Sequence, residues 1–80
     1  MEPFIRAVDN AQVVAVQYTG TAKSVHKIID IIGCQIGITN TEIGLMVAGS
    51  LYRRGTWFVK SEKSIVPVVA KAFEVDYYKE

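Results

Sequence analysis

The stretch Val13-Val14-Ala15-Val16-Gln17-Tyr18-Thr19-Gly20 decides the fold of this 80-residue chain, because an apolar run leads directly into a turn. The run is rich in β-branched residues and apolar on both faces, so residues 12–18 are predicted to form a strand covered on both sides. A helix is predicted to begin just after the turn. Its unpaired backbone N–H groups would then lie beside Tyr18, which we expect to be exposed. Such a corner can hold an anionic ligand.

The predicted helix covers residues 22–32. Its apolar residues recur at the spacing i, i+3, i+4 and i+7, and they are Val25, Ile28, Ile29 and Ile32. The polar face is predicted to consist of Lys23, Ser24, His26, Lys27 and Asp30. Thr21 is the expected N-cap and Gly33 the expected glycine after the last turn, so both ends of the helix are marked.

The remainder of the chain predicts short strands and turns. Residues 34–39 alternate as a half-buried strand, with Cys34, Ile36 and Ile38 inward, and a turn is expected at residues 40–41. A strand is predicted over 42–52, interrupted or bent around 48–50, followed by a hairpin connection at 53–55 and a strand over 56–60. After a turn at 61–64, the next strand covers 65–68, where Pro67 indicates an edge position or an exit from the sheet. One helical turn is predicted over 69–72 and a last strand over 73–78, with Phe73, Val75 and Tyr77 inward.

These elements predict an α+β fold, with one amphipathic helix packed on a curved, mostly antiparallel sheet of about five or six strands. Residues 1–80 are expected to form a single domain, with a core over 12–78 and an N-terminal extension over 1–11. Half of the residues are hydrophobic, which is high for so small a chain. Because one helix covers only one face of a sheet, we expect a homo-oligomer to bury the opposite face.

Composition also excludes several kinds of protein. A net charge of +1 gives little electrostatic attraction for long nucleic acid or an anionic membrane. No apolar stretch approaches the roughly 20 residues of a membrane span, and residues 1–9 do not resemble a secretory signal. The single cysteine, Cys34, excludes an intramolecular disulfide and a multi-cysteine zinc site, which favours a reducing cytoplasm.

Three motifs resemble a widespread family of small bacteriophage proteins. Residues 14–20, Val-Ala-Val-Gln-Tyr-Thr-Gly, are similar to that family's "EAVQWTG" opening. Residues 55–60, Gly-Thr-Trp-Phe-Val-Lys, stand where the family has "GDWIVKG", and residues 73–77, Phe-Glu-Val-Asp-Tyr, match its "FE..Y" ending. The likeness covers roughly residues 12–78. Arg54 replaces the family's turn proline and Thr56 its aspartate, and residues 63–70 depart from its "GEFYPCKPD" stretch.

The resemblance implies a role in the cytoplasm of a bacterial host. Small phage proteins of this architecture look like the sponges that sequester the cyclic nucleotide messengers of the anti-phage systems CBASS and Thoeris. A sponge of this kind binds a cyclic dinucleotide or a related ligand and needs no cofactor.

Two segments are candidates for contacting such a ligand. The turn Tyr52-Arg53-Arg54-Gly55-Thr56-Trp57 offers two guanidinium groups for phosphates between two aromatic rings for bases. Alternatively, Tyr52 and Trp57 are packing residues and both arginines are solvated. The corner Thr19-Gly20-Thr21 offers backbone N–H groups and hydroxyls to a phosphate, or it only caps the helix, and Tyr18 beside it could stack on a base. His26 lies with Lys23 and Lys27 on a face that is either solvated or in weak contact with phosphate.

The sequence does not predict an enzyme. No two of its acidic residues form a recognisable acid/base pair with a positioned nucleophile, and neither GxxxxGK[ST] nor GxGxxG is present. The expected function is therefore sequestration of a cyclic nucleotide immune messenger by a phage-encoded protein, without catalysis and without a metal. The alternative is a phage protein–protein interaction module that binds a host enzyme or a virion component, and a structural assembly role comes third.

Overall fold

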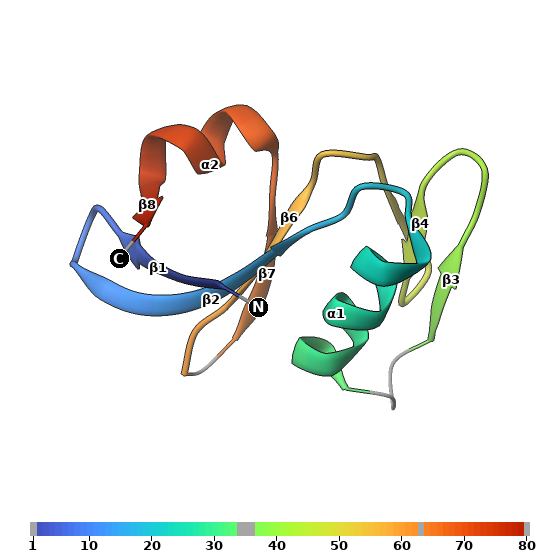
Figure 1. The fold of residues 1–80 in the computed structure, drawn as a ribbon, viewed down its shortest axis with the longest axis horizontal. Coiled ribbons are helices and arrows are strands. Elements are labelled where there is room, and N and C mark those ends of the chain that lie inside the picture. Colours follow the sequence, from blue (N-terminus) through green and yellow to red (C-terminus); the bar gives the residue numbers. More distant parts are fainter. Residues whose placement is uncertain (1, 34–36, 63, 80) are drawn as a thin grey trace.

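The computed structural model describes residues 2–33, 37–62 and 64–79, and it shows an α+β fold (Figure 1). The described residues form two helices and eight strands. In chain order these are β1 (Glu2–Arg6), β2 (Ala11–Gln17), α1 (Ala22–Ile32), β3 (Ile38–Asn40), β4 (Leu45–Val47), β5 (Ser50–Tyr52), β6 (Trp57–Lys60), β7 (Ile65–Val68), α2 (Ala70–Asp76) and β8 (Tyr77–Lys79).

The strands form two antiparallel sheets rather than the single sheet that we expected. The larger sheet has the order β7-β6-β2-β1-β8, and the smaller has the order β3-β4-β5. In the larger sheet β2 lies at the centre, with Val16 opposite Phe58 of β6 and Val13 opposite Phe4 of β1. The expectation of one helix on one sheet is therefore wrong, because the described residues contain a second helix and a separate three-stranded sheet.

The strand and helix predicted from the opening stretch are confirmed. Strand β2 spans Ala11–Gln17, and α1 has the predicted bounds Ala22–Ile32. The Oγ1 atom of Thr21 accepts the N–H of Ser24 at 3.1 Å, and the N–H of Gly33 donates to the carbonyl of Ile29 at 2.7 Å. Both predicted caps are thus present. Ser24 is an exception to the predicted polar face, because its side chain is buried under the N-terminal turn.

The larger sheet has an apolar cluster on each face. On the side of α1, Val16, Tyr18 and Phe58 pack with the helix and with Leu45 of the smaller sheet. On the side of α2, the cluster consists of Phe4, Val13, Ala15, Val59 and Phe73, with Trp57, Val68 and Tyr77 packed against it. Strand β6 therefore alternates, with Phe58 facing one cluster and Trp57 and Val59 the other.

Residues 73–76 of the strand predicted over 73–78 belong to helix α2, and only Tyr77 and Tyr78 are extended, in β8. The Phe73 ring, on α2, stacks on the ring of Tyr77, the first residue of β8, with centroids 4.8 Å apart, and both pack in the second cluster. Phe73 is buried, whereas Val75 is 78% exposed and does not point inward as expected. Because α2 covers the second face of the sheet, that face does not need a second subunit to bury it.

The strand predicted over residues 42–52 is interrupted rather than bent, because residues 45–52 form a hairpin of β4 and β5. Ala48 and Gly49 both have positive φ, at 50° and 86°, and this two-residue turn reverses the chain between β4 and β5. The predicted hairpin connection at residues 53–55 is also wrong. This segment carries the chain from β5 of the smaller sheet to β6 of the larger sheet, and these two strands do not pair.

The remaining predictions have mixed outcomes. Residues 1–11, expected outside the core, supply β1, which lies between β2 and β8 and buries Phe4. Strand β7 lies at the sheet edge, as Pro67 predicted. Asn40, expected in a turn, ends β3. The start of the strand predicted over 34–39, Cys34 to Ile36, lies outside the described residues.

Candidate functional site

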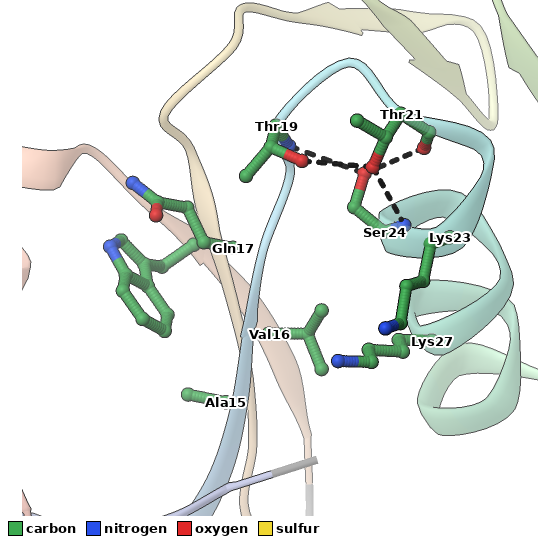
Figure 2. Close-up of a pocket in the computed structure, with 9 residues that line it drawn as sticks. Ala15, Val16, Gln17, Thr19, Thr21, Lys23, Ser24 and Lys27 are labelled. Atoms are coloured by element: carbon green, nitrogen blue, oxygen red, sulfur yellow. Dashed lines mark hydrogen bonds between the residues drawn. The ribbon is translucent and has the colours of Figure 1, made fainter.

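A groove of about 290 Å³ opens where β2 ends and α1 begins (Figure 2). We call it the α1–β2 groove. It is lined by residues of β2, of the following turn, of the first two turns of α1, and by one residue of β6. These residues are Ala15, Val16, Gln17, Thr19, Thr21, Lys23, Ser24, Lys27 and Trp57.

Two lysines form the helical wall of the groove. Lys23 and Lys27 are four residues apart, so they share one face of α1, and Figure 2 shows both side chains extending toward β2. None of the nine lining residues is acidic. Within the described residues no carboxylate forms an ion pair with either ammonium group. The groove therefore has a positive wall that attracts anions.

The hydroxyls at the mouth of the groove are mostly occupied by helix capping. Ser24 donates its hydroxyl to the carbonyl of Thr21 at 2.8 Å and accepts the N–H of Thr19 at 3.2 Å. The Oγ1 atoms of Thr19 and Thr21 lie 3.0 Å apart and share one hydrogen bond. Since a hydroxyl carries one proton, one of these two threonines keeps an O–H for a ligand whichever donates to the other. The corner thus caps the helix and retains one free donor.

Trp57 and Gln17 lie opposite each other in the sheet at the strand side of the groove. The indole of Trp57 stacks on Phe73 with centroids 3.9 Å apart and meets the edge of Phe4 at 5.4 Å. One face of the indole is therefore used in packing, while part of the ring lines the groove. The side-chain amide of Gln17 donates to the carbonyl of Gly55 at 3.2 Å, which ties the end of β2 to the turn before β6.

Tyr18 is not exposed, contrary to the sequence analysis. Its side chain has no exposed area, and its hydroxyl donates to Oδ1 of Asn40 in the smaller sheet. Its backbone also bonds the turn before β6, with the N–H donating to Thr56 at 2.8 Å and the carbonyl accepting from Gly55 at 2.7 Å. Tyr18 therefore packs between the two sheets, and it cannot stack on a ligand base in this conformation.

Gly20 and Arg54 are brought into contact, although they lie in separate predicted segments. A Cβ atom built on Gly20 would be 2.5 Å from Nε of Arg54, and Gly20 has a φ of +85°. A side chain at this position would therefore strain the backbone and displace the guanidinium group. Arg54 itself is exposed and does not line the α1–β2 groove.

Tyr52 and Arg53 line a second groove of about 360 Å³, which we call the β5–β7 groove. Its lining is mainly apolar and consists of Leu51, Tyr52, Arg53, Thr56, Pro67, Val68 and Val69. Tyr52 also packs edge-on against Phe58, with centroids 5.3 Å apart. The turn from Tyr52 to Trp57 therefore does not present one surface. Tyr52, Arg53 and Thr56 line this groove, Arg54 lies against Gly20, and Trp57 lines the α1–β2 groove.

Gln17 was not predicted to line a site, and Lys23 and Lys27 were predicted to lie on a face that is either solvated or in weak contact with phosphate. The available signal was their spacing of four residues, starting directly after the helix cap. His26, which lies between them in sequence, is exposed and is not a lining residue of the groove.

Away from the groove, one ion pair holds the turn between β1 and β2. Arg6 donates to Asp9 through Nε at 3.0 Å and through NH2 at 2.9 Å. These hydrogen bonds, with that from the Ala11 N–H, lower the pKa of the Asp9 carboxyl, and the same pair raises the pKa of Arg6. The side chains of Arg6 and Asp9 are 31% and 48% exposed, so the pair fixes a turn at the surface.

Comparison of the chain with protein-family models, curated proteins and solved structures finds no match. Among the described residues, neither helix is long and apolar enough to cross a membrane. The same residues contain no group of three histidine, cysteine or carboxylate side chains that could hold a metal ion.

Proposed function

We propose that the protein binds a small phosphate-bearing nucleotide in the α1–β2 groove and sequesters it without chemical change. The resemblance to small phage proteins suggests the ligand class, a cyclic nucleotide messenger of a bacterial immune system. In that role the protein acts in the host cytoplasm and keeps the messenger below the level that activates its effector. Sequestration requires affinity and abundance, and it requires no catalytic residue.

The observation that carries this proposal is that Lys23 and Lys27 of α1 line the same groove as Trp57 of β6. Ammonium groups bind phosphate oxygens through charge-assisted hydrogen bonds, and an indole ring contacts a base. The free hydroxyl of the Thr19–Thr21 pair adds one neutral donor at the mouth of the groove. Charge, hydrogen bonding and aromatic surface, the three requirements of a nucleotide site, thus occur together here.

The size of the groove suggests that two copies of the chain would be needed to bind one cyclic dinucleotide. A volume of about 290 Å³ lies at the lower end of ligand pockets, roughly 300–1,000 Å³, and suits one nucleotide unit. A cyclic dinucleotide has two such units, so a second copy of the chain would supply the second groove. The homo-oligomer is therefore proposed on the size of the groove. It no longer depends on an uncovered sheet face, because α2 covers that face.

Isothermal titration calorimetry against cyclic di- and trinucleotides, ADP-ribose derivatives and mononucleotides tests the proposal. The double variant Lys23→Gln/Lys27→Gln should bind at least tenfold more weakly, because each lost charge-assisted hydrogen bond costs about 1.5–3 kcal/mol. The matched control is Lys60→Gln/Lys71→Gln, which removes the same charge at exposed positions outside the groove and should bind as the parent does. No binding by the parent to any of these ligands would refute the proposal.

The second candidate function is the protein–protein interaction module, and the β5–β7 groove is the observation that favours it. Leu51 and Val69 of this groove are 44% and 65% exposed, beside Pro67 and with Arg53 at the rim. Apolar surface of this kind suits the side chains of a partner protein. If this is the main function, substitutions in the β5–β7 groove will abolish the activity of the protein in phage infection, and the two lysine changes will not.

A further inference from the structure

The turn between β3 and β4 presents an exposed isoleucine next to a glutamate. Ile43 is 75% exposed, and Glu42 before it is also exposed. Thr41 fixes the turn, because its N–H and its hydroxyl donate to the carbonyl of Gly44 at 2.9 and 2.6 Å, and its Oγ1 accepts the N–H of Gly44 at 3.1 Å. Glu42 and Ile43 therefore lie on a pre-organised turn, which loses little conformational entropy when a partner covers it.

This turn lies directly beside the β5–β7 groove. A Cβ atom built on Gly44 would be 2.5 Å from the carbonyl oxygen of Tyr52 and 3.1 Å from Cδ1 of Leu51. Both of these residues line the groove, and Ile43 is the residue before Gly44. One continuous surface therefore carries an exposed aliphatic side chain and an apolar groove of about 360 Å³.

The charges on this surface are complementary. None of the seven residues that line the groove is acidic, and Arg53 is the one charged residue among them. The charged residue of the turn is Glu42. Among the described residues neither Arg53 nor Glu42 forms an ion pair, so both charges are available to a partner. The groove fits a partner with an aliphatic side chain beside a carboxylate, and the turn itself presents this combination.

Other exposed apolar side chains fit the groove less well. Val8 is followed by Asp9, whose carboxylate is already paired with Arg6 at 2.9 Å. Val75 has acidic neighbours, but it lies near the end of α2, and Figure 1 places that end and β8 at the opposite end of the molecule from the smaller sheet. A contact between Val75 and the groove would join two different surfaces, and such head-to-tail contacts continue into rings or filaments.

We propose that two copies of the chain form a two-fold symmetric dimer, in which Ile43 of each copy enters the β5–β7 groove of the other and Glu42 pairs with Arg53 across the interface. Because the isoleucine and the groove lie on the same surface, a two-fold axis makes each contact twice and closes the assembly at two copies. Dimerisation of this kind does not depend on the nucleotide. It assigns the apolar groove to a second copy of this chain and not to a different protein.

Charge reversal tests the interface by sedimentation velocity. The parent should form dimers at concentrations up to about 100 µM, which covers weak but specific association. Glu42→Arg places two arginines opposite each other at both contacts, and Arg53→Glu places two glutamates there, so each variant should dissociate at least about tenfold more readily. An equimolar mixture of the two variants has opposite charges at both contacts and should dimerise as the parent does. Both positions are exposed, so folding should be retained.

A second pair of variants tests the apolar contact. Ile43→Ser removes the side chain that enters the groove, and it should raise the dimer dissociation constant at least about tenfold, because the contact is lost twice. The matched control is Val75→Ser, at a similarly exposed position (78%) that lines neither groove, and it should associate as the parent does.

Three outcomes would overturn the dimer. They are a parent that stays monomeric throughout the concentration range, a mixture of the two charge variants that associates no better than either variant alone, and dissociation by Val75→Ser without dissociation by Ile43→Ser. None of them bears on nucleotide binding in the α1–β2 groove, which calorimetry measures separately.

Discussion

The α1–β2 groove and the β5–β7 groove lie close together and have opposite chemistry. The first has two lysines, three hydroxyl side chains and one indole, whereas the second is lined mostly by aliphatic residues with one arginine at its rim. Tyr18 lies between the segments that form them, since its backbone bonds the turn that leads from Arg53 to Trp57. The comparison teaches that the proposed ligand site and the apolar surface are formed by different side chains. A substitution in one groove should leave the other unchanged.

The largest expected effect follows from removing the residue that joins the two regions. Tyr18→Ala deletes a fully buried aromatic side chain and its hydrogen bond to Asn40, so we expect it to lower the free energy of unfolding by about 3–5 kcal/mol. Chemical denaturation measures this loss. A loss below about 1 kcal/mol would show that Tyr18 is not part of the core.

Tyr18→Phe is the matched variant, because it keeps the ring and removes only the hydroxyl. It should cost about 1 kcal/mol and leave nucleotide affinity unchanged, since the ring does not line the α1–β2 groove. A large drop in affinity for this variant would indicate that Tyr18 contacts the ligand after all.

The second effect in size tests whether Arg54 belongs to the α1–β2 groove. Gly20→Val places a β-branched side chain at a φ of +85° and against Nε of Arg54, so we expect a stability loss of about 1–3 kcal/mol. The new side chain points toward Arg54 and Arg54 does not line the groove, so nucleotide affinity should change little. Arg54→Ala serves as the control. Weaker binding by both variants, in calorimetry, would place Arg54 in the ligand site.

The sequence predicted the region around the opening stretch well and the later elements poorly. The run from Val13 to Gly20 and the helix after it have strong local signals, namely β-branched residues, a period of 3.6 and caps at both ends. Residues 73–77 fit an alternating strand and a helix equally, and only the stacking of Phe73 on Trp57 and Tyr77 favours the helix. Short apolar runs carry this ambiguity until tertiary contacts decide it.

The sequence predicted several residues of the candidate site, but it did not predict how these residues are placed relative to one another. Thr19, Thr21 and Trp57 do line the groove, but Tyr18 turns inward because its pairing with Thr56 continues the β2–β6 ladder. The pairing of β1 with β2 has no local signal in residues 1–11. The contact of Arg54 with Gly20 likewise joins segments that are more than thirty positions apart in the sequence.

A smaller effect concerns the cap at the mouth of the α1–β2 groove. Thr21→Ala removes the acceptor of the Ser24 N–H and the partner of the Thr19 hydroxyl, so stability should fall by about 1 kcal/mol. Thr21→Ser retains the hydroxyl and should recover most of that loss. Denaturation curves measure both values. If Thr21→Ala also weakens nucleotide binding and Thr21→Ser does not, the free hydroxyl is a ligand donor in addition to its capping role.

The smallest expected effect on stability comes from lysine substitutions at exposed apolar positions of the β5–β7 groove. Leu51→Lys and Val69→Lys alter exposed side chains, so each should change the free energy of unfolding by no more than about 0.5 kcal/mol.

If the chain self-associates through this groove, sedimentation velocity will show both variants as smaller species than the parent. Val8→Lys, at a position that is 87% exposed and outside both grooves, should sediment as the parent does. Dissociation by all three variants would indicate a general effect of added charge. An unchanged oligomer in the two groove variants would leave this apolar surface to a different protein.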